Sequence, residues 1–334
     1  MSVDWEESAC ALCGELDGTS VLAIPQPDAP AGVAHLWQCR SCGLRRLNPR
    51  PSPGALGHYY ALAQGYNAFL GRTRSPHVQR VWDFLRDAHS RPPSLRGWRR
   101  IVAPLAAPIA RWAFDINLRL DGPRPPRVLE IGSGYGDILI YLQQRGCDVL
   151  GVDPSPQAAE AGRRHGIDIR VGCVADLQLP DASFDAVILC HSLEHVPDPN
   201  RELGEAARLL RPEGQLHLAV PNGHAVRLTL DGLHWAHLSH PLHLWYFDAR
   251  SLTRLLARHR LVPIRPPVTT SRHHPFQHGC REFLHGQPLA ATRQLLRFLS
   301  ASLRTPDGGD VLRLIAAKSP TPDPAPPPVP DTPA

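Results

Sequence analysis

The sequence predicts an α/β protein built on a doubly wound, mostly parallel, seven-stranded sheet. From residue 127 onward, apolar strand-like runs alternate with helical segments, as in parallel sheets that carry helices on both faces. The first of these runs opens into a glycine-rich turn, Gly132-Ser-Gly134-Tyr-Gly136, and the second ends at Asp153. A glycine turn after one strand and an acid at the tip of the next are typical of nucleoside-binding sheets of this class.

Each element of this sheet is expected from its own hydrophobic pattern and its flanking residues. The expected strands are Val128–Ile131, Asp148–Val152, Ile167–Val171, Phe184–Cys190, Gln215–Val220, Leu261–Arg265 and Val311–Ala317. The expected helices are Gly136–Arg145, Ser155–His165, Asn200–Leu210, Ser251–His259 and Ala290–Leu303. The run Phe184–Cys190 is apolar enough for the sheet centre. The last two strands lack a βαβ signature, which favours an antiparallel hairpin at the sheet edge.

Composition narrows the class of protein. The 334 residues allow one large core and a smaller module. The net charge of +5 is modest and no dense basic run is interleaved with aromatic residues, so we do not expect a nucleic-acid substrate. No apolar run approaches the ~20 residues of a membrane span, and the N-terminus does not read as a signal segment. We therefore expect a cytoplasmic protein.

The chain divides into four predicted parts: a cysteine-containing module (1–58), a helical cap with its linker (59–125), the sheet domain (126–318) and a Pro-rich tail (319–334). The tail cannot bury a core and is expected to be disordered. Residues 76–120 have a partly apolar helical face, which we expect to pack on the main domain. Its members are Trp82, Phe84, Leu85, Trp98, Ile101, Leu105, Ile109, Trp112 and Ile116.

Four cysteines near the N-terminus form two Cys-x-x-Cys-Gly turns, which are Cys10 with Cys13 and Cys39 with Cys42. Each turn directs two thiolates at one point, as in a zinc ribbon. Two disulfides or two redox dithiols are the alternatives. Reducing conditions in the cytosol disfavour disulfides, and duplication of the turn disfavours a redox role. We expect a structural zinc ion with no open coordination position for catalysis.

The glycine turn itself favours one kind of ligand. Glycine is needed where the backbone lies against a ligand or adopts positive φ. The spacing Glu130-x-Gly132-x-Gly134-x-Gly136 lacks the second intervening residue of the dinucleotide fingerprint. No Lys or Ser/Thr follows the glycines as a phosphate loop would require, so this turn is not a phosphate loop. The ligand is expected to be a nucleoside without a pyrophosphate.

Three further segments follow predicted strands at the same sheet edge, where ligands bind in doubly wound folds. Asp153, before Pro154, is expected to accept hydrogen bonds from a ribose diol. Asp176 is placed to accept an adenine amino group while Ala175 or Leu177 packs on the ring. The last segment runs from Cys190 to Val196. The alternative for each acid is a helix cap or a surface loop.

Residues 127–222 resemble the class I S-adenosylmethionine (SAM)-dependent methyltransferases. The resemblance is carried by the glycine turn, Asp153, Val174-Ala-Asp176, Phe184-Asp185, Leu193-Glu-His-Val196 and Leu210-Arg-Pro-Glu-Gly214. It implies the Rossmann-like methyltransferase fold and SAM as cofactor. The expected cofactor-binding residues are Glu130, Gly132, Ser133, Gly134, Tyr135, Gly136, Asp153, Pro154, Ala175, Asp176, Cys190 and Tyr66.

The N-terminal half adds a narrower resemblance. A four-cysteine ribbon, Asn48-Pro-Arg-Pro and then Tyr59, Tyr60 and Tyr66 are similar to zinc-ribbon methyltransferases of sugar and polysaccharide biosynthesis. Some members of that group methylate a carbon beside a ketone in nucleotide-linked deoxysugars. They are usually longer, with a C-terminal domain that this chain lacks. The resemblance implies a small, sugar-linked acceptor.

Glu194 and His195 are the candidate catalytic pair. Transfer from a sulfonium is an in-line displacement in which the enzyme mainly aligns donor and acceptor. The acceptor must also lose a proton, and a histidine can accept it near neutral pH. The resemblance implies the same pair, because related sugar C-methyltransferases use Glu-His here. Alternatively, His195 caps its loop or orients the cofactor.

A histidine-rich segment follows the fifth strand and contains His234, His237, His240 and His243. The three-residue spacing would suit a metal site on a helix, but Pro241 interrupts any helix. We favour a substrate-facing loop, and we expect His273, His274 and His278 to line the same mouth.

Together these features predict a SAM-dependent methyltransferase that acts on a small, sugar-linked metabolite, with Tyr66 reaching over the sulfonium. One alternative is an O- or N-methyltransferase of a natural-product or lipid-linked acceptor. A second is a catalytically silent SAM-fold protein whose ribbon recruits a partner. A dehydrogenase is disfavoured by the glycine spacing.

Overall fold

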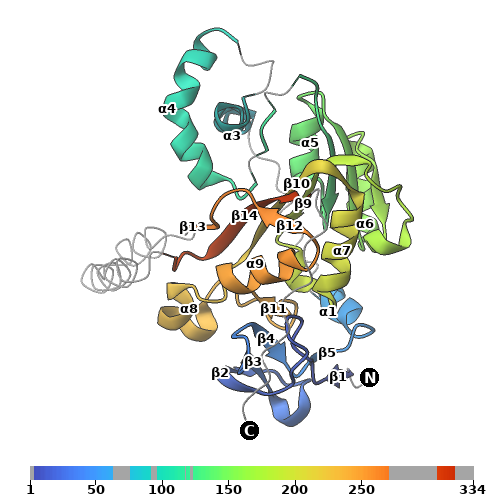
Figure 1. Cartoon of the computed structure of the whole chain (residues 1–334), viewed down its shortest axis with the longest axis vertical. Helices are drawn as coiled ribbons and strands as arrows, with labels where there is room; N and C mark the ends of the chain where they lie inside the picture. Colours follow the sequence, from blue (N-terminus) through green and yellow to red (C-terminus); the bar gives the residue numbers. More distant parts are fainter. Residues whose placement is uncertain are drawn as a thin grey trace, which may run out of the picture.

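In the computed structural model, the residues described are 4–62, 76–91, 96–116, 118–120, 123–270 and 307–319. A twisted central sheet with strand order β12-β14-β10-β9-β6-β7-β8 dominates these residues, and β13 pairs with β14 beside this path (Figure 1). The strands are β6 Arg127–Ile131, β7 Asp148–Asp153, β8 Ile169–Val171, β9 Phe184–Cys190, β10 Leu210–Pro221, β12 Leu261–Pro263, β13 Val268–Thr270 and β14 Val311–Lys318.

The predicted fold class is confirmed, and the seven predicted strands form the seven-strand path. Strands β8, β7, β6, β9 and β10 are parallel to their neighbours, whereas β14 runs antiparallel to both β10 and β12. The predicted edge hairpin is therefore present as β12 and β14. Strand β13 was not predicted. Strand β10 begins five residues earlier than expected, across a register shift between Leu210 and Gln215.

The helices between these strands are α5 Asp137–Gln143, α6 Pro156–Arg164, α7 Pro199–Leu209, α8 Val226–Asp231 and α9 Ala249–Ala257. Side chains cap the free amides at the start of α7 and of α9. Before α7, the Asp198 carboxylate accepts hydrogen bonds from the amides of Asn200 (2.9 Å) and Arg201 (3.2 Å). Asp248 and Ser251 form a capping box at α9. The helix predicted over Ala290–Leu303 lies outside the described residues.

The N-terminal module is a small antiparallel sheet completed by a strand from much later in the chain. Its strands are β1 Trp5–Glu6, β2 Gly18–Pro25, β3 Val33–Cys39, β4 Arg45–Asn48 and β5 Arg50–Pro51. β11 (Trp245–Tyr246) pairs with β4, so one sheet has the order β11-β4-β3-β2. Buried side chains of the module, such as Leu36 and Leu47, belong to the same hydrophobic cluster as Leu193 and Trp245. The ribbon and the sheet domain are thus packed as one body.

A helical hairpin packs beside α5 of the sheet domain. After α1 (Leu56–Leu62), it consists of α3 (Pro76–Ser90) and α4 (Trp98–Ala113), at the upper left of Figure 1. Phe84 and Leu85 of α3 pack with Ala88 and with Ala103 and Ala106 of α4, and not on the main domain as expected.

The expectation that the larger residues of α4 pack on the main domain is wrong. Trp98, Ile101 and Leu105 are 64%, 78% and 78% exposed. The physical reason is that the alanines supply the packed contact between α4 and α3, whereas of the larger residues Trp98 reaches α3 with its ring 5.8 Å from that of Phe84. Ile116 packs against the core as predicted, whereas the side chains of Trp82, Ile109 and Trp112 lie outside the part that the structure describes.

A search of the described helices for one long and apolar enough to cross a bilayer finds none. Most of the Pro-rich tail, and the segment that holds His273, His274 and His278, lie beyond the described ranges.

Candidate active site at the carboxyl ends of the parallel strands

The glycine turn between β6 and α5 has the conformation that its sequence predicts. Gly132, Gly134 and Gly136 all have positive φ, at 73°, 51° and 80°. A Cβ on Gly132 would also lie 2.4 Å from the Cβ of Ser192, so no side chain fits there. The amides of Gly132 and Ser133 are held by the carbonyl of Val152 at 2.8 and 3.1 Å. The loop is therefore fixed against the ends of β7 and β9.

Asp153 joins this loop to the next helix. Its Oδ2 accepts a hydrogen bond from the Gly134 amide (2.8 Å), and its Oδ1 accepts one from the Ser155 amide (2.9 Å). Burial raises the pKa of Asp153, and the two amide hydrogen bonds oppose that rise. The Asp153 carboxylate thus partly has a local structural role, as expected if the acid only caps a helix or a loop. Each oxygen keeps a second lone pair, which a ribose hydroxyl can use.

Buried polar atoms without partners surround the glycine turn. Oε2 of Glu130 and the hydroxyls of Ser133 and Ser192 have no hydrogen-bond partner among the described residues. Burial raises the pKa of Glu130 well above its usual value. Unsatisfied buried groups are rare in proteins and often mark a missing ligand or water. These unsatisfied groups lie beside the glycine turn, where the bare backbone is open to a ligand. This arrangement fits a polar nucleoside.

The other predicted cofactor residues are placed less uniformly. Tyr135 and Ala175 are half-buried, Pro154 is exposed, and Cys190 is half-buried at the end of β9. Asp176, in the short helix η2 (Val174–Asp176), is exposed and pairs with Arg201 of α7 at 3.2 Å. Its carboxylate is therefore drawn toward α7. Tyr66 lies outside the described residues.

After β9, a second group of polar side chains begins with His191. Its Nε2 lies 3.2 Å from Oδ2 of Asp115, and its Nδ1 lies 3.4 Å from Oε1 of Glu194. Burial disfavours the charged ring, but the two carboxylates outweigh this and raise the pKa of His191 to about 10. His191 is therefore an imidazolium clamped between two acids.

Glu194 and His195 lie in the short helix η3 (Leu193–His195). The Glu194 side chain is 0% exposed, and within the described residues neither carboxylate oxygen has a hydrogen-bond partner. His195 Nδ1 lies 3.1 Å from the carbonyl oxygen of Leu242. A carbonyl only accepts, so Nδ1 carries the proton and Nε2 is the basic nitrogen of the neutral ring. Burial lowers the pKa of His195 despite the nearby Glu194.

The histidine-rich segment contributes to this group through two of its four histidines. The His243 ring meets that of His195 edge-on at 4.5 Å between centroids, and His237 stacks on His191 at 5.8 Å. His243 Nδ1 lies 2.8 Å from the carbonyl of His237, and burial lowers the pKa of His243 well below its usual value. His240 instead contacts Gln26 of the N-terminal module at 3.2 Å.

Sequence reasoning named His195, Glu194 and the loop that holds His243, but it did not pair them. Asp115 was given no role, and neither His191 nor Tyr60, whose ring lies 6.1 Å from that of His195, was assigned a contact with the pair. His191 had a usable signal, because it is the first residue after the central strand. Asp115 lies in the cap, and nothing in its local sequence marks it. The atoms of Glu194, His195 and His243 that could ligate a metal ion lie within 4.8 Å of one another. This group shares only His243 with the four evenly spaced histidines that were considered as a metal site.

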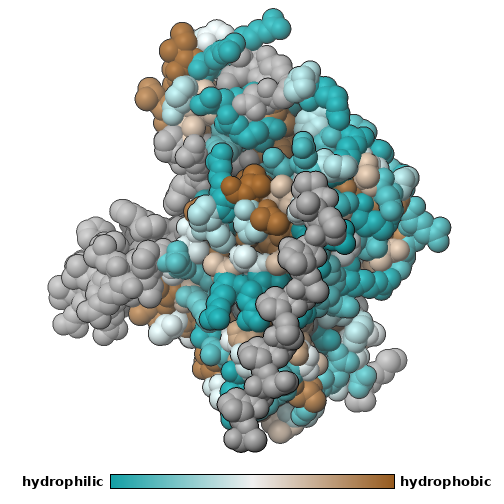
Figure 2. All heavy atoms as spheres, viewed as in Figure 1, coloured by the Kyte–Doolittle hydropathy of each residue, from teal (hydrophilic) through white to brown (hydrophobic). Residues whose placement is uncertain are grey.

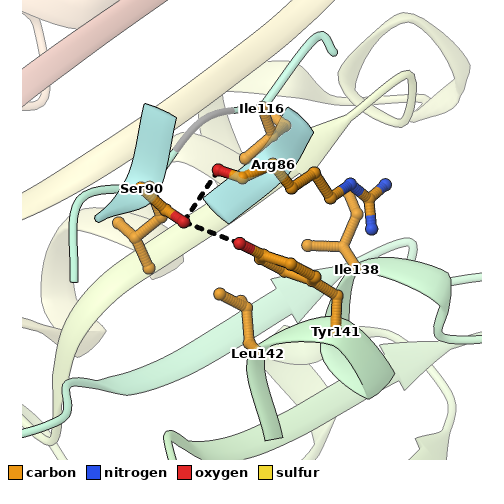
Figure 3. Close-up of a pocket in the computed structure, with 7 residues that line it drawn as sticks. Arg86, Ser90, Ile116, Ile138, Tyr141 and Leu142 are labelled. Atoms are coloured by element: carbon orange, nitrogen blue, oxygen red, sulfur yellow. Dashed lines mark hydrogen bonds between the residues drawn. The ribbon is translucent and has the colours of Figure 1, made fainter. Parts of the chain in front are cut away.

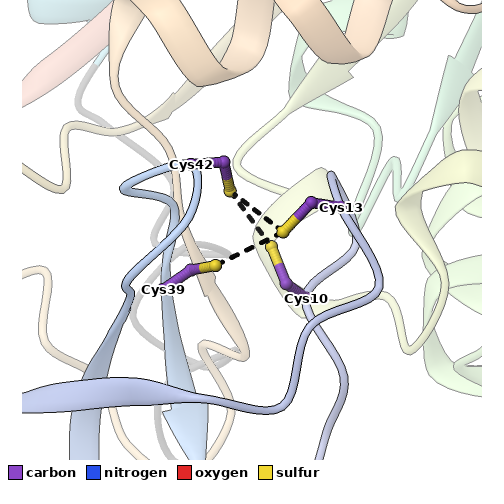
Figure 4. A group of neighbouring side chains, drawn as sticks. All are labelled: Cys10, Cys13, Cys39 and Cys42. Atoms are coloured by element: carbon purple, nitrogen blue, oxygen red, sulfur yellow. Dashed lines mark hydrogen bonds between the residues drawn. The ribbon is translucent and has the colours of Figure 1, made fainter. Parts of the chain in front are cut away.

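The four N-terminal cysteines converge as predicted (Figure 4). The sulfurs of Cys10 and Cys42 are 3.4 Å apart, those of Cys13 and Cys39 are 3.3 Å apart, and those of Cys13 and Cys42 are 3.5 Å apart. All four are free thiols. Four sulfurs at ~2.3 Å from a tetrahedral zinc would be separated by about 3.8 Å, so a small relaxation admits the ion. Burial opposes ionisation of Cys39, but amide hydrogen bonds from Cys42 and Ser41 outweigh it and lower the pKa to about 7.

Fold and site together place a glycine loop and a group of histidines and carboxylates at the carboxyl edge of a doubly wound sheet. The sequence model of a methyltransferase domain family matches residues 96–262, half of the chain. The chain therefore belongs to this methyltransferase family, and the predicted family resemblance is confirmed at that level.

Individual relatives match over shorter stretches. The ubiquinone biosynthesis O-methyltransferase of Xanthomonas oryzae pv. oryzae (strain PXO99A) is 39% identical over 103 residues, which are 29% of this chain and 43% of the relative. The protein of that name from Alkalilimnicola ehrlichii is 32% identical over 145 residues, covering 36% of this chain and 59% of the relative. This chain thus spans about half the length of these curated relatives.

Solved structures are more distant. A putative methyltransferase in complex with the Haloferax volcanii Trm112 activator is 17% identical, with a TM-score of 0.49 over 77% of this chain and 95% of that one. The [4+2]-cyclase SpnF is 20% identical, with a TM-score of 0.47 over 80% of this chain and 97% of that one.

Proposed function

We propose that this protein is a SAM-dependent methyltransferase that transfers a methyl group to a hydroxyl oxygen of a small molecule. The observation that carries the proposal is the glycine loop. Asp153 binds its backbone, and three buried polar groups beside it (Glu130, Ser133 and Ser192) have no hydrogen-bond partner among the described residues. At Gly132 there is no room for a side chain. Membership of the methyltransferase family supports the same activity. The oxygen acceptor is favoured by relatives that are named O-methyltransferases.

In this proposal the loop amides and Asp153 hold the nucleoside, and Glu130 and Ser133 bind its polar groups. Bound SAM supplies an electrophilic methyl group on a sulfonium. His195 Nε2 accepts the acceptor's hydroxyl proton as the oxygen attacks, since its Nδ1 is held by Leu242. The lowered pKa of His195 keeps the ring neutral and basic near pH 7. Glu194, a buried carboxylate that also pairs with His191 at 3.4 Å, stabilises the imidazolium that forms on His195.

The predicted sugar-linked acceptor is a second candidate. It is favoured by the four-cysteine ribbon, whose sheet is joined to the histidine-rich segment through β11. Histidines and Tyr60 around His195 would suit a ligand with several hydroxyls. Methylation of carbon rather than oxygen would leave a new C–C bond in the product.

We also propose that the four cysteines hold a structural zinc ion. The convergence of their sulfurs supports it, and four sulfur ligands leave no open position for chemistry. The ion would stabilise the module whose strand β4 pairs with β11.

Two measurements test the function. Isothermal titration should give micromolar binding of SAM and of its demethylated product, and methyl-labelled SAM should label one of a panel of phenolic and nucleotide-sugar acceptors. NMR of the product separates O-methyl from C-methyl. Binding of both nucleosides without turnover on any acceptor would favour the catalytically silent alternative, and binding of NADH in place of SAM would revive a dehydrogenase.

A further inference from the structure

Helix α4 presents a large apolar face to solvent. Trp98, Ile101, Val102 and Leu105 are spaced three and four residues apart, so they share one side of the helix. They are 64%, 78%, 37% and 78% exposed. Figure 2 shows hydrophobic side chains over α4 at the upper end of the molecule. A single exposed apolar residue is ordinary, but a contiguous set on one helix face marks an interaction site.

The opposite face of α4 already performs the packing that the hairpin needs. Ala103, Ala106 and Ala107 are buried, and the first two join Ala88, Phe84 and Leu85 of α3 in one cluster. Turning the helix to bury the large residues would expose only alanines. The larger face is therefore outside the hairpin's own core, although its burial would gain more free energy.

Positive charge borders this apolar face. Arg96, Arg99 and Arg100 are exposed at the start of α4, and Arg91 is exposed just after α3. The first turn of α4 contains no acidic residue. Cations at a helix N-terminus are unfavourable to the helix itself, so their presence needs another reason. A helix with Trp, Ile and Leu on one side and arginines beside them matches the composition of helices that lie in the interface of anionic membranes.

The hairpin is firmly attached to the cofactor side of the sheet domain. Asp87 pairs with Arg145 at 2.9 Å, and Ser90 hydrogen-bonds Tyr141 of α5 at 2.6 Å. Arg86, Ser90, Ile116, Ile138, Tyr141 and Leu142 enclose a small hollow at this junction (Figure 3). A surface that binds α4 would therefore lie at a fixed position relative to α5, the helix that follows the glycine loop.

We propose that the exposed face of α4 docks on an anionic lipid bilayer, with Trp98, Ile101 and Leu105 in the interface and Arg99 and Arg100 on lipid headgroups. The contact is peripheral and extends beyond the proposed methyl transfer, because it needs neither cofactor nor turnover. It would let the protein meet an acceptor or release a product at a lipid surface.

The test is co-sedimentation of the full chain with vesicles of phosphatidylcholine alone and with vesicles that also contain phosphatidylglycerol. We expect binding to the anionic vesicles, weakened by high salt. The variant Trp98→Ser/Ile101→Ser/Leu105→Ser should bind at least ~tenfold more weakly, and Arg99→Gln/Arg100→Gln roughly tenfold more weakly. These side chains are mostly exposed, so folding should survive even though Trp98 loses its ring contact with Phe84. The matched control, Val262→Ser/Ile264→Ser/Val268→Ser, removes three exposed apolar residues elsewhere and should bind like the parent protein.

Two outcomes overturn the proposal. One is a parent protein that binds neither kind of vesicle, or whose binding the α4 triple variant leaves unchanged. The other is a parent protein that sediments as a dimer, with a triple variant that is monomeric, since a second copy would then cover the face. Because vesicle binding is measured without SAM, these outcomes are independent of whether the protein is a methyltransferase.

Discussion

The two halves of the candidate site are built in different ways. The cofactor half is local, since the glycine loop and Asp153 lie within one βαβ unit and contact one another mainly through backbone amides. The acceptor half joins side chains from distant segments, such as His191 to Asp115 across 76 residues and His195 to Leu242 across 47. The geometry of the cofactor half is determined by local backbone conformation. The geometry of the acceptor half depends on how the cap, η3 and the histidine-rich segment pack together.

This difference predicts that substitutions in the two halves affect different properties of the enzyme. Changes in the loop should weaken cofactor binding, whereas changes in the acceptor half should slow turnover at unchanged cofactor affinity. The N-terminal module belongs with the acceptor half. Its Arg50 donates to the carbonyl of Pro197 (3.0 Å), and Trp245 of β11 donates to that of Val196 (2.8 Å).

Loss of the zinc site should produce the largest effect. We expect Cys39→Ser, or chelation, to remove about one equivalent of zinc and to lower the midpoint of thermal unfolding by on the order of 10 °C, because metal binding contributes to folding. Below that transition, turnover should fall more than ~tenfold while SAM affinity stays within about threefold. Calorimetry, metal analysis and titration measure these quantities.

The control for this variant is Cys173→Ser, an exposed cysteine outside the cluster. It should keep its zinc and its unfolding midpoint. A Cys39→Ser protein with unchanged stability and zinc content would show that the four sulfurs hold no ion.

Removing the proposed base should have the next largest effect. We expect His195→Ala to lower kcat by ~10²–10⁴-fold with little change in the Kd for SAM. Because the pKa of His195 is lowered, the parent enzyme should lose activity only below about pH 6.5, where the ring becomes protonated. The variant should lack this acidic limb. The half-buried His259, which follows the C-terminus of α9 and lies 3.4 Å from Oδ1 of Asn200, gives a control as His259→Gln.

A His195→Ala enzyme that keeps both its rate and the acidic limb would exclude the general-base role. His195 would then serve as a loop or cofactor-orienting residue, which is the alternative that its sequence position allows.

What sequence could predict follows the same division. The strands, the glycine turn and the place of Asp153 at the end of β7 were all predicted, because each depends on residues close together in the chain. Asp115 was not predicted, and His243 was assigned to a substrate-facing loop without being paired with His195, because both contacts depend on tertiary packing. The exposed apolar face of α4 was predicted to pack on the main domain, and this prediction was wrong for a related reason. Periodicity identifies an apolar face but does not specify its partner, and small alanines took the packed side.

Two aspartates that were expected to bind the same nucleoside offer a third test. Asp153→Ala should raise the Kd for SAM by about 10- to 100-fold, the loss expected for hydrogen bonds to a charged group. Asp176→Ala should change it by less than about threefold, because its carboxylate is exposed and paired with Arg201. Titration calorimetry on both variants decides this. An equal loss in the two would mean that Asp176 turns inward when the cofactor binds.

The smallest effect should come from the clamp around His191. The folded-state pKa of His191 is raised to about 10 by Asp115 and Glu194, above the usual ~6.5 of an unfolded chain. The clamp therefore contributes its full stability below about pH 6.5 and loses it as the pH rises through 10. Compared with His191→Gln, the parent protein should unfold a few degrees higher at pH 6.5, and this difference should shrink toward pH 10. Comparing the two proteins cancels the titration of other groups. A difference that stays constant with pH would mean that the ring is neutral, and the acceptor half would then rest on packing rather than on charge.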